Sequence, residues 1–569
     1  MPLGLSGRLV LGLGIVAAVY LISAPLAMLL IAAFRGPKDL LPFEPGAHWT
    51  FDNLIAVYVD RSLYVTIIPN TVVFVAGAVA LGFIVAFVLA WLVERTDLPL
   101  RNEIFTAILF PLLVPGVVLA IAWIDLLGPR AGWLNVVMRA TFGLSGEGPV
   151  NLFSMSGMIL VQGTALVPFV FLLLSAALRA MNPALEEASS MAGASPAATF
   201  FRVTLPVLRP GILAPLILAT LVVLEQFELP LVIGLPARIN VFSTRIYYEL
   251  NPDSNLPAYG RAAAVALPFL AAGIVLLAIY NRLIARSERF TTVAGKAYRP
   301  SRLPLGRWKY PALALVAFYL LLAVVLPLTV LVWTSVFGFQ SAAAGTFLPH
   351  ASFDAYARLF ADATFRLAVG NTFLVAGISA AAVTAIGAIL AWVVLRTKIP
   401  GRAALDFLSF LSLGIPSVIA GLAALLLYLA LPIGVYGTVW VLVLAYCYRL
   451  AVATRLARAG LTQLHTELEE AAAASGAGWS GTIRCIVLPL LAPSLTASFV
   501  LLFIIGFREF TLPVLLQSQD NIVLSVIMWN LFVANKATDA AAVGTLILIA
   551  VAPVIFFGRR ALAGRDGRG

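Results

Sequence analysis

Five charged residues lie within or at the ends of long apolar stretches of the sequence: Asp125, Glu225, Glu228, Arg508 and Glu509. A charge inside a bilayer is costly, so such residues usually face a partner or a water-filled path. Arg508-Glu509 stands 283 residues after Glu225-Gln226, and both pairs precede Phe-x-Leu-Pro. Glu225, Glu228, Arg508 and Glu509 are therefore candidates for a path or a gate, in which Glu225 and Arg508 could pair. The alternative is an ion pair that only fixes helix packing.

Residue types that support catalysis or metal binding are few. The two cysteines, Cys447 and Cys485, belong to no Cys-x-x-Cys pattern, and the three histidines are far apart. These numbers exclude a zinc finger and a disulfide framework. The sequence also lacks the G-x-x-x-x-G-K-[ST] loop that binds nucleotide phosphates. We therefore predict no catalytic residue, no metal site and no cofactor on this chain.

A longer pattern occurs twice between apolar stretches. It begins with Glu-Ala and a small residue, has Gly six positions after the Glu, and ends with Leu-Pro. The first copy contains Glu187, Gly193 and Leu205-Pro206. Every one of these positions recurs 283 residues later, at Glu470, Gly476 and Leu488-Pro489. A pattern of this length that occurs twice indicates a specific function.

Each copy predicts a helix–turn–helix segment, named the elbow here, over residues 183–206 and 466–489. Gly193 and Gly476 should end the first helix, and a second helix should begin near Ser195-Pro196. Thr466 and Glu469 have the spacing of a capping box, and Leu-Pro should end each elbow. The apolar face of the second helix requires a partner. The candidate contact residues are Glu186, Glu187, Gly193, Phe200, Leu205, Pro206, Glu469, Glu470, Gly476, Ile483, Leu488 and Pro489.

The composition predicts the elements that position these residues. Of 569 residues, 62% are hydrophobic and 11% are charged, against about 25% charged in soluble domains. The mean hydropathy is +1.01, which excludes soluble, disordered and fibrous proteins. We predict an all-α polytopic membrane protein. Its twelve apolar spans cover about 10–33, 64–93, 105–127, 155–178, 211–235, 262–281, 310–337, 367–395, 404–429, 432–454, 491–516 and 540–558.

The basic residues are distributed unevenly between alternate loops. With the N-terminus in the cytoplasm, the inside segments hold 25 of the 37 Lys and Arg residues, and the outside loops hold 11. Arg449 is counted in the inside loop 449–484, and Arg508 lies within a span. Cytoplasmic loops are rich in Lys and Arg, so both termini are predicted to be cytoplasmic. The net charge of +11 therefore reflects topology, and no nucleic-acid partner is expected.

The two halves of the chain repeat each other. Asn70-Thr71 and Arg95-Thr96 recur 301 residues later as Asn371-Thr372 and Arg396-Thr397. The basic segment 282–309 contains no apolar span and separates the halves. We predict a first transmembrane domain at 1–281, a cytoplasmic linker at 282–309 and a second transmembrane domain at 310–569. Halves with an even number of spans share one orientation, so a pathway is expected between them.

The repeated elbow resembles the EAA loop of ABC-importer permeases. Residues 126–135, 167–188 and 288–300 resemble the fused, double-length permeases for ferric iron. Related fused permeases handle thiamine or aminoethylphosphonate. Two positions depart from the family pattern: Ser189 replaces the common Ala, and Gly478 stands where Ser195 precedes the second helix of the first elbow. The two elbows are therefore not expected to be equivalent.

The resemblance implies a fold and partners. The fold would be two tandem six-helix type I importer domains in the inner membrane. Two copies of a cytoplasmic ABC ATPase, which hold ATP and Mg²⁺, would dock on the elbows, and an extracytoplasmic binding protein would deliver a small solute, with ferric iron favoured. The rival hypothesis is a secondary transporter, driven by an ion gradient, with Glu225, Glu228 or Glu509 as the proton carrier. A membrane enzyme has weak support, because no nucleophile or metal constellation is present.

Overall fold

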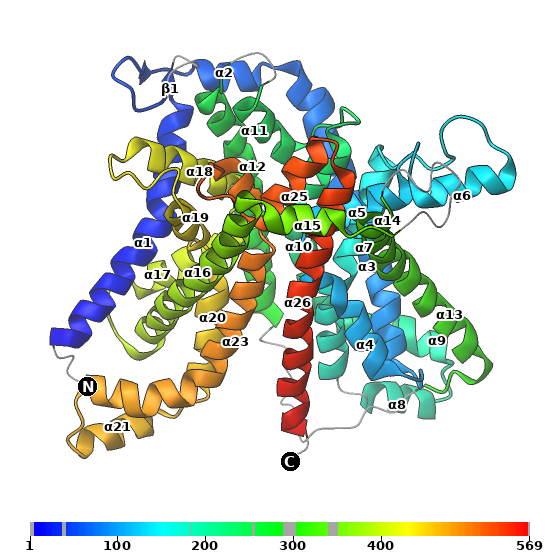
Figure 1. Cartoon of the computed structure of the whole chain (residues 1–569). Helices are drawn as coiled ribbons and strands as arrows, with labels where there is room; N and C mark the ends of the chain where they lie inside the picture. Colours follow the sequence, from blue (N-terminus) through cyan, green and yellow to red (C-terminus); the bar gives the residue numbers. More distant parts are fainter. Residues whose placement is uncertain are drawn as a thin grey trace. The chain divides into compact units, whose positions relative to one another are not determined.

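The computed structural model describes residues 5–36, 41–181, 184–252, 256–287, 303–338 and 351–566. Most of the predicted linker, 288–302, lies outside these residues, as do Asn182 and Pro183 at the start of the first elbow. The described residues are almost entirely helical (Figure 1). Their one sheet is the antiparallel pair β1 (Arg35–Gly36) and β2 (His48–Trp49). The all-α architecture predicted from the composition is confirmed.

The chain forms two compact units. Unit 1 comprises residues 1–63, 245–274 and 362–527. Its helical elements are α1 (Leu5–Ala33), α2 (Asp52–Tyr58), most of α11 (Phe242–Leu250), the first part of α12 (Tyr259–Ser287), α16 (Ala363–Arg396), α17 (Arg402–Leu411), η8 (Ser412–Gly414), α18 (Ser417–Ala430), α19 (Val439–Tyr446), α20 (Leu450–Thr462), α21 (Thr466–Ala474), α22 (Trp479–Thr482), η9 (Ile483–Val487), α23 (Leu488–Phe507), α24 (Thr511–Leu516) and the start of α25 (Leu524–Val533).

Unit 2 comprises residues 64–244, 275–361 and 528–569. Its helical elements are η1 (Leu63–Ile67), α3 (Ile68–Arg95), α4 (Arg101–Leu109), η2 (Phe110–Leu113), α5 (Gly116–Leu127), α6 (Trp133–Phe142), α7 (Met155–Ala180), α8 (Ala184–Met191), α9 (Pro196–Thr199), η3 (Phe200–Thr204), α10 (Leu205–Leu224), η4 (Pro230–Gly234), η6 (Gly306–Trp308), α13 (Lys309–Leu320), η7 (Leu321–Val325), α14 (Leu326–Phe337), α15 (Asp354–Ala361) and α26 (Ala537–Asp566).

The units cut across the two sequence halves. α1, the first span of the first half, packs against α16, α17 and α18 of the second half. In unit 2, α14 of the second half packs against α5 of the first half. The predicted division at 282–309 follows the internal repeat, whereas the compact units follow side-chain packing. Each set of core helices is thus completed by helices from the other half.

The predicted spans correspond to long apolar helices, some of which are bent. In the described residues, eight helices are long and apolar enough to cross a membrane, or up to eleven if each bent helix pair counts as one span. The predicted span 105–127 is divided at Val114-Pro115, where the helix axis bends by 102°, and the span 404–429 is divided at Ile415-Pro416, with a bend of 110°. A residue that precedes proline is driven to the extended region. Val114 and Ile415 are accordingly extended, with ψ of 128° and 108°.

Other prolines are accommodated without a break. π-helical turns precede Pro69, Pro206, Pro327 and Pro489, and each turn ends two residues before the proline. Proline lacks an N–H and its ring collides with the carbonyl four residues earlier, so widening the helix by one residue relieves the collision. The second helix of each elbow therefore continues past Leu-Pro into the membrane span. The helix continues from Ala197 to Leu224 in the first half, and from Trp479 to Phe507 in the second.

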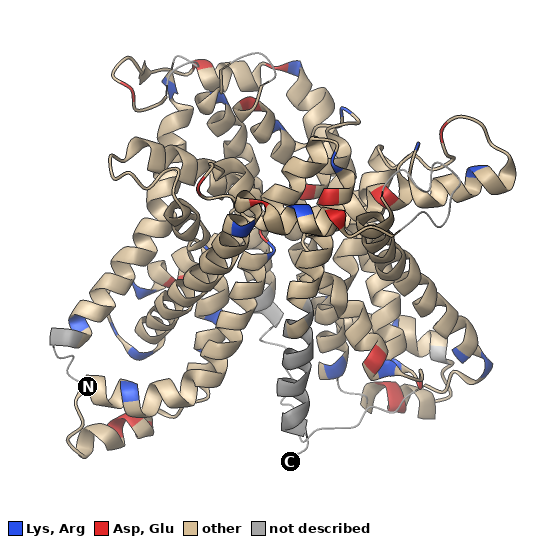
Figure 2. Cartoon of the chain, in the orientation of Figure 1, with Lys and Arg blue, Asp and Glu red and all other residues tan. Residues whose placement is uncertain are grey.

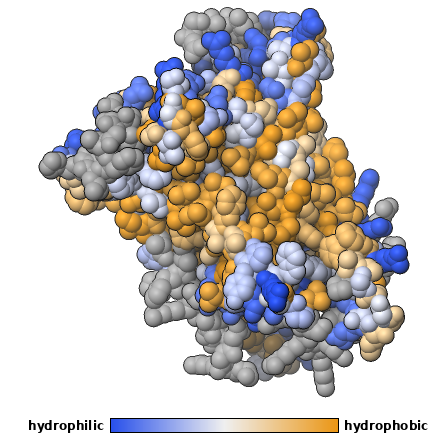
Figure 3. All heavy atoms as spheres, turned by 90° about the vertical axis from the view of Figure 1, so that its right-hand side faces the viewer, coloured by the Kyte–Doolittle hydropathy of each residue, from blue (hydrophilic) through white to orange (hydrophobic). Residues whose placement is uncertain are grey.

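The surface is consistent with a membrane environment. Most Lys, Arg, Asp and Glu residues lie near the ends of the long helices (Figure 2). The face in Figure 3 carries a broad band of hydrophobic residues, with hydrophilic residues mostly towards its two ends. A bilayer solvates apolar side chains across its core and polar ones at its boundaries.

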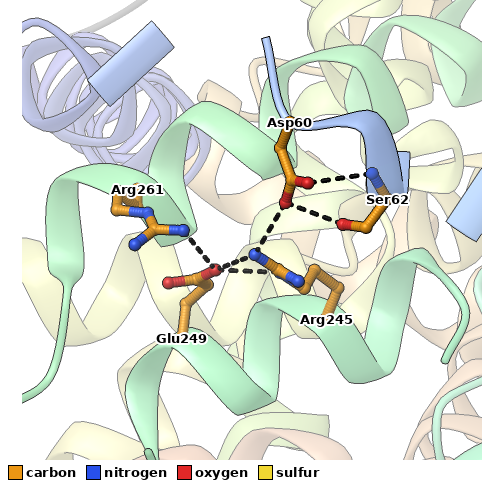
Figure 4. A network of polar contacts seen from close by, with 5 residues as sticks. All are labelled: Asp60, Ser62, Arg245, Glu249 and Arg261. Atoms are coloured by element: carbon orange, nitrogen blue, oxygen red, sulfur yellow. Dashed lines mark hydrogen bonds and ion pairs between the residues drawn. The ribbon is translucent and has the colours of Figure 1, made fainter. Parts of the chain in front are cut away.

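A polar network ties together three segments of unit 1 that are predicted to be extracytoplasmic (Figure 4). The Asp60 carboxylate accepts hydrogen bonds from the backbone N–H and the hydroxyl of Ser62, at 2.8 and 2.7 Å. The Arg245 guanidinium lies 3.4 Å from Asp60 and 2.7 Å from Glu249 on α11. Arg261 on α12 lies 3.3 Å from the same Glu249 oxygen. The network therefore fixes the loop after α2 against α11 and α12.

Replacement of Ser62 by alanine is expected to lower the stability of the protein more at neutral pH than in acid. The Ser62 hydrogen bonds and then the nearby Arg245 and Arg261 lower the pKa of Asp60, which is about 3.9 in unfolded chains. A lowered carboxyl pKa gives stability that is present above the unfolded pKa and is lost as pH falls through the folded pKa. The deficit of Ser62→Ala in thermal unfolding should therefore shrink below about pH 4. An equal deficit at pH 7 and pH 3.5 would contradict this, and the exposed Ser480→Ala serves as the control.

Candidate functional site: the two elbows and an intramembrane ion pair

The predicted turn within each elbow is present. Gly193 has φ +82° and Gly476 has φ +81°, a left-handed conformation that costs side-chain-bearing residues about 1–2 kcal/mol. The N–H of Ala194 donates to Ser189 O at 3.1 Å, and the N–H of Ala477 donates to Ala472 O at 3.0 Å. These bonds satisfy carbonyls at the ends of α8 and α21. Both glycines thus terminate the first elbow helix, as the spacing predicts.

The second helices of the two elbows begin differently. In the first elbow the Ser195 hydroxyl accepts a hydrogen bond from the N–H of Ala198 at 3.2 Å. In the second, Gly478 occupies the N-cap position and offers no side chain. The predicted capping box of Thr466 and Glu469 was wrong. His465 occupies the N-cap of α21 without a side-chain cap, so Thr466 is already within the helix, and the Glu469 carboxylate pairs with Arg396 instead.

An arginine at the end of a long helix binds each elbow. In unit 2, Arg95 at the end of α3 lies 3.1 Å from the Glu186 carboxylate and donates to Leu178 O at 3.1 Å. Thr204 donates to the other Glu186 oxygen at 2.6 Å. The Arg95 side chain is 3% exposed and that of Glu186 is 19% exposed. A charged pair with so little water must be held in one geometry to offset desolvation.

The same ion pair occurs in unit 1. Arg396 at the end of α16 lies 3.0 Å from Glu469 and donates to Leu461 O at 3.1 Å. A second bond joins Arg396 to Leu464 O at 2.6 Å. Arg396 follows Arg95 by 301 residues, and Glu469 follows Glu186 by 283. The recurrence of one contact at both repeat offsets makes the Arg–Glu pair part of the elbow, and we name the two pairs the elbow ion pairs.

Two predicted contact residues pack against their own unit. Phe200 meets Trp91 and Phe87 of α3, with ring centroids 4.9 and 6.2 Å apart. Ile483, its counterpart, packs on the buried cluster that contains Ala391 and Leu461. These side chains anchor the elbow to the membrane helices. Leu205-Pro206 and Leu488-Pro489 lie at the starts of α10 and α23.

Other side chains are available to a partner. Leu185 is 53% exposed, and its counterpart Leu468 is 45% exposed. Met191 is 84% exposed, whereas the matching position holds the smaller Ala474. Glu187 is half-buried and Glu470 is exposed. A partner would therefore meet an apolar surface beside one carboxylate on each elbow, and the Met191 contact would exist only on the first.

The segment that precedes α13 is bound to the end of α3, beside the first elbow. The N–H of Leu303 donates to Arg95 O at 2.9 Å, and the N–H of Leu305 donates to the Asp97 carboxylate at 2.7 Å. A hollow of about 480 Å³ lies among Leu303, Trp91, Arg95 and the elbow. The end of the predicted linker is thus fixed to the cytoplasmic loop predicted after α3.

Glu509, one of the intramembrane charges of the second half, forms an ion pair that was not predicted from the sequence. Glu509 pairs with Arg449, which also donates to Ser417 Oγ at 3.1 Å. The other Glu509 oxygen accepts from the N–H of Leu512 at 3.2 Å. Arg449 was assigned to a cytoplasmic loop, but it occupies the bend between α19 and α20, two helices that form one candidate span. The predicted span ended too early because α20 is amphipathic.

The remaining candidates lie at breaks in the helices. Glu225 caps the C-terminus of α10, and Arg508 caps that of α23. The Glu228 carboxylate lies so close to the first residue of α5 that a Cβ on Gly116 would be 2.0 Å from its Oε2. Glu225 and Arg508 belong to different units, so their pairing stays a prediction. Asp125 on α5 is 2% exposed and lies within unit 2.

A different signal could have identified the arginines. Arg95-Thr96 and Arg396-Thr397 were recognised only as repeat markers, although an arginine at the end of an apolar span requires a partner. The repeated glutamates, Glu186 and Glu469, could have been recognised as partners of opposite charge. Arg449 had no such marker, because the first half has Leu166 at the matching position. Within the described residues, no group of three or more His, Cys, Asp or Glu side chains could hold a metal ion.

Comparison with known proteins identifies the function class. Residues 78–289 and 383–565 each match the family described as binding-protein-dependent transport system inner membrane component. The two matches together cover more than half of the chain and one lies in each sequence half. The predictions of a transport permease rather than an enzyme, and of two permease halves on one chain, are confirmed.

Individual relatives have different substrates in their names. A ferric transport system permease protein of Actinobacillus pleuropneumoniae is 26% identical over 90% of this chain and 74% of its own length. An Fe(3+)-transport system permease protein of Haemophilus influenzae is 24% identical over 80% of this chain and 81% of its own. A sulfate transport system permease protein of Escherichia coli is 25% identical over 48% of this chain and 87% of its own.

Proposed function

Because this chain belongs to the family of binding-protein-dependent transport system inner membrane components, we propose that it carries ferric iron across the inner membrane as the fused permease of an ATP-driven importer. The importer class rests on the family match in both halves. The ferric cargo is supported by relatives named for iron that match most of this chain. Thiamine and aminoethylphosphonate are the alternative cargoes.

The elbows are the proposed sites of energy coupling. Each presents an exposed leucine, Leu185 or Leu468, beside a carboxylate, Glu187 or Glu470. Each is also attached to a long membrane helix by an ion pair with little solvent exposure. A cytoplasmic ATPase that moves the elbow would therefore move the end of α3 or α16 with it. The repeat of this construction is the single observation that carries the coupling proposal.

The assembly follows from two elbows. One copy of an ABC ATPase, with ATP and Mg²⁺, would dock under each half, and an extracytoplasmic binding protein would deliver the cargo. Both termini would be cytoplasmic, as the excess of Lys and Arg on that side favours. The importer would alternate between outward-open and inward-open states. This chain's own residues would supply the path and the mechanical contacts.

The left-handed glycines provide the test. In vesicles that contain this chain, its ATPase and its binding protein, Gly193→Pro combined with Gly476→Pro should reduce ATP-dependent uptake at least about tenfold. Proline fixes φ near −65° and cannot adopt the observed +82° and +81°. The turn would open, and the elbow would no longer fit a partner.

The matched control is Gly478→Pro in the second elbow. Gly478 has φ −71°, which suits proline, and nothing lies within 4 Å of its added Cβ. Uptake should stay near that of the original protein. Uptake that persists in the double variant, or that continues without ATP and stops when the proton gradient is removed, would contradict the coupling proposal.

The cargo is tested separately in the same vesicles. Uptake of ferric iron delivered by the binding protein should depend on ATP and should not be reduced by excess thiamine or aminoethylphosphonate. ATP-dependent uptake of either competitor, with no transport of iron, would overturn the iron assignment but leave the importer class intact.

A further inference from the structure

A hollow of about 540 Å³ lies in unit 1 between α1, α16 and the start of α23. Small-molecule sites have volumes of about 300–1,000 Å³. The lining is apolar except for the hydroxyls of Thr384 and Thr496 and the indoles of two tryptophans. Its lining residues include Val10, Leu488 and Phe499, which are 44%, 42% and 37% exposed. The walls belong to candidate membrane spans, so the open side faces the position of lipid chains.

The matching position of the first half contains bulkier side chains. Ala388 and Ile483 line the hollow, and their counterparts are Phe87 and Phe200 at offsets of 301 and 283. The rings of Phe87 and Phe200 lie 6.2 Å apart, and Phe200 also meets Trp91. Smaller residues leave this space empty in the second half. At these two positions the second half therefore leaves space that aromatic rings occupy in the first half.

α1 forms one wall of the hollow. Val10 and Leu11 line it, and one turn later a Cβ on Gly14 would lie 2.7 Å from Ile389 of α16, so the two helices are in close contact there. The lining extends from Trp479 and Ile483 of the second elbow to Ala381 and Phe499 within candidate membrane spans.

Polar groups at the elbow end indicate what the occupant carries. Arg8 and Arg484 are exposed; Arg8 precedes Leu11 by one helical turn, and Arg484 follows Ile483. The indole nitrogens of Trp392 and Trp479 are buried, so these two side chains contribute apolar ring surface to the hollow. An occupant with an apolar tail and a negative charge would suit both the apolar lining and the two arginines.

We propose that this hollow binds an acyl chain of an anionic phospholipid, with its headgroup beside Arg8 and Arg484. The lipid would fill the space that Phe87 and Phe200 fill in the first half. The lipid would contact α20, the helix that precedes the second elbow, but would not contact α7, which precedes the first elbow.

The test is lipid retention by the full chain. The protein is purified from membranes that contain phosphatidylglycerol and phosphatidylethanolamine, and retained lipid is measured by native mass spectrometry. The original chain should keep at least one phosphatidylglycerol molecule. Ala388→Phe, which installs the first-half residue, should reduce this retention at least about tenfold. The exposed Leu374→Phe on the same helix is the control and should retain lipid.

A second variant separates the headgroup from the chain. Arg8→Gln with Arg484→Gln should keep a lipid in the hollow but lose the preference for phosphatidylglycerol over phosphatidylethanolamine. If Ala388→Phe disturbs folding, Ala388→Leu replaces it and should give an intermediate loss. Equal retention by the original chain and the Ala388 variants would overturn the site. Retention without headgroup preference in the original chain would overturn its anionic character.

Discussion

Arg396→Met should lower ATP-dependent uptake at least about tenfold and make the second elbow more sensitive to limited proteolysis. The substitution removes the partner of the Glu469 carboxylate, 3.0 Å away, while that side chain is only 16% exposed. Loss of one partner from a buried ion pair costs about 3–5 kcal/mol. The charge left behind should pull the elbow toward water and detach it from α16.

The double variant Arg396→Met/Glu469→Gln distinguishes coupling from stability. Removal of both charges relieves the unpaired carboxylate, so thermal stability should recover. Uptake should stay low if the ion pair transmits motion, because the elbow is no longer attached to α16. Arg455→Met is the control, since Arg455 is 43% exposed and 3.9 Å from Asp406. Normal uptake by the double variant would assign the pair a structural role only.

Arg449→Leu should be among the most destabilising single changes in the second half. It leaves Glu509, whose side chain is 8% exposed, without its cationic partner inside a candidate span. The expected loss is again about 3–5 kcal/mol, measured as a lower unfolding temperature in detergent. Glu509→Gln should also be destabilising, because it leaves the Arg449 guanidinium without its carboxylate partner.

The first half supplies the matched rescue. Its residues at these positions are Leu166 and Gln226, so Arg449→Leu/Glu509→Gln reproduces an arrangement that the same fold already accepts. Stability should return to near that of the original protein. Transport then decides between the two hypotheses for Glu509. Normal uptake by this stable double variant would identify the pair as a packing device, and lost uptake would favour a path or a gate.

Much of the elbow could be predicted because its signals are local. Gly193 and Gly476 end helices through their own conformational freedom, and Ser195 caps the next helix with its own hydroxyl. The continuation of the helix past Leu-Pro was not predicted, because a proline can either end a helix or be accommodated by a helical turn that is wider by one residue. The choice depends on what packs around it. In the first half, the ring contact between Phe200 and Trp91 packs this helix against α3.

The sequence by itself determined the membrane class, the two halves and the paired elbows, because composition, repeat offsets and turn residues are properties of short segments. Only the tertiary structure decided which charges meet. Arg95 finds Glu186 across 91 residues, and Arg449 finds Glu509 across 60. It also decided that α1 joins the helices of the second half. Such pairings minimise unpaired charge and unfilled space over the whole fold, and neither quantity can be evaluated one segment at a time.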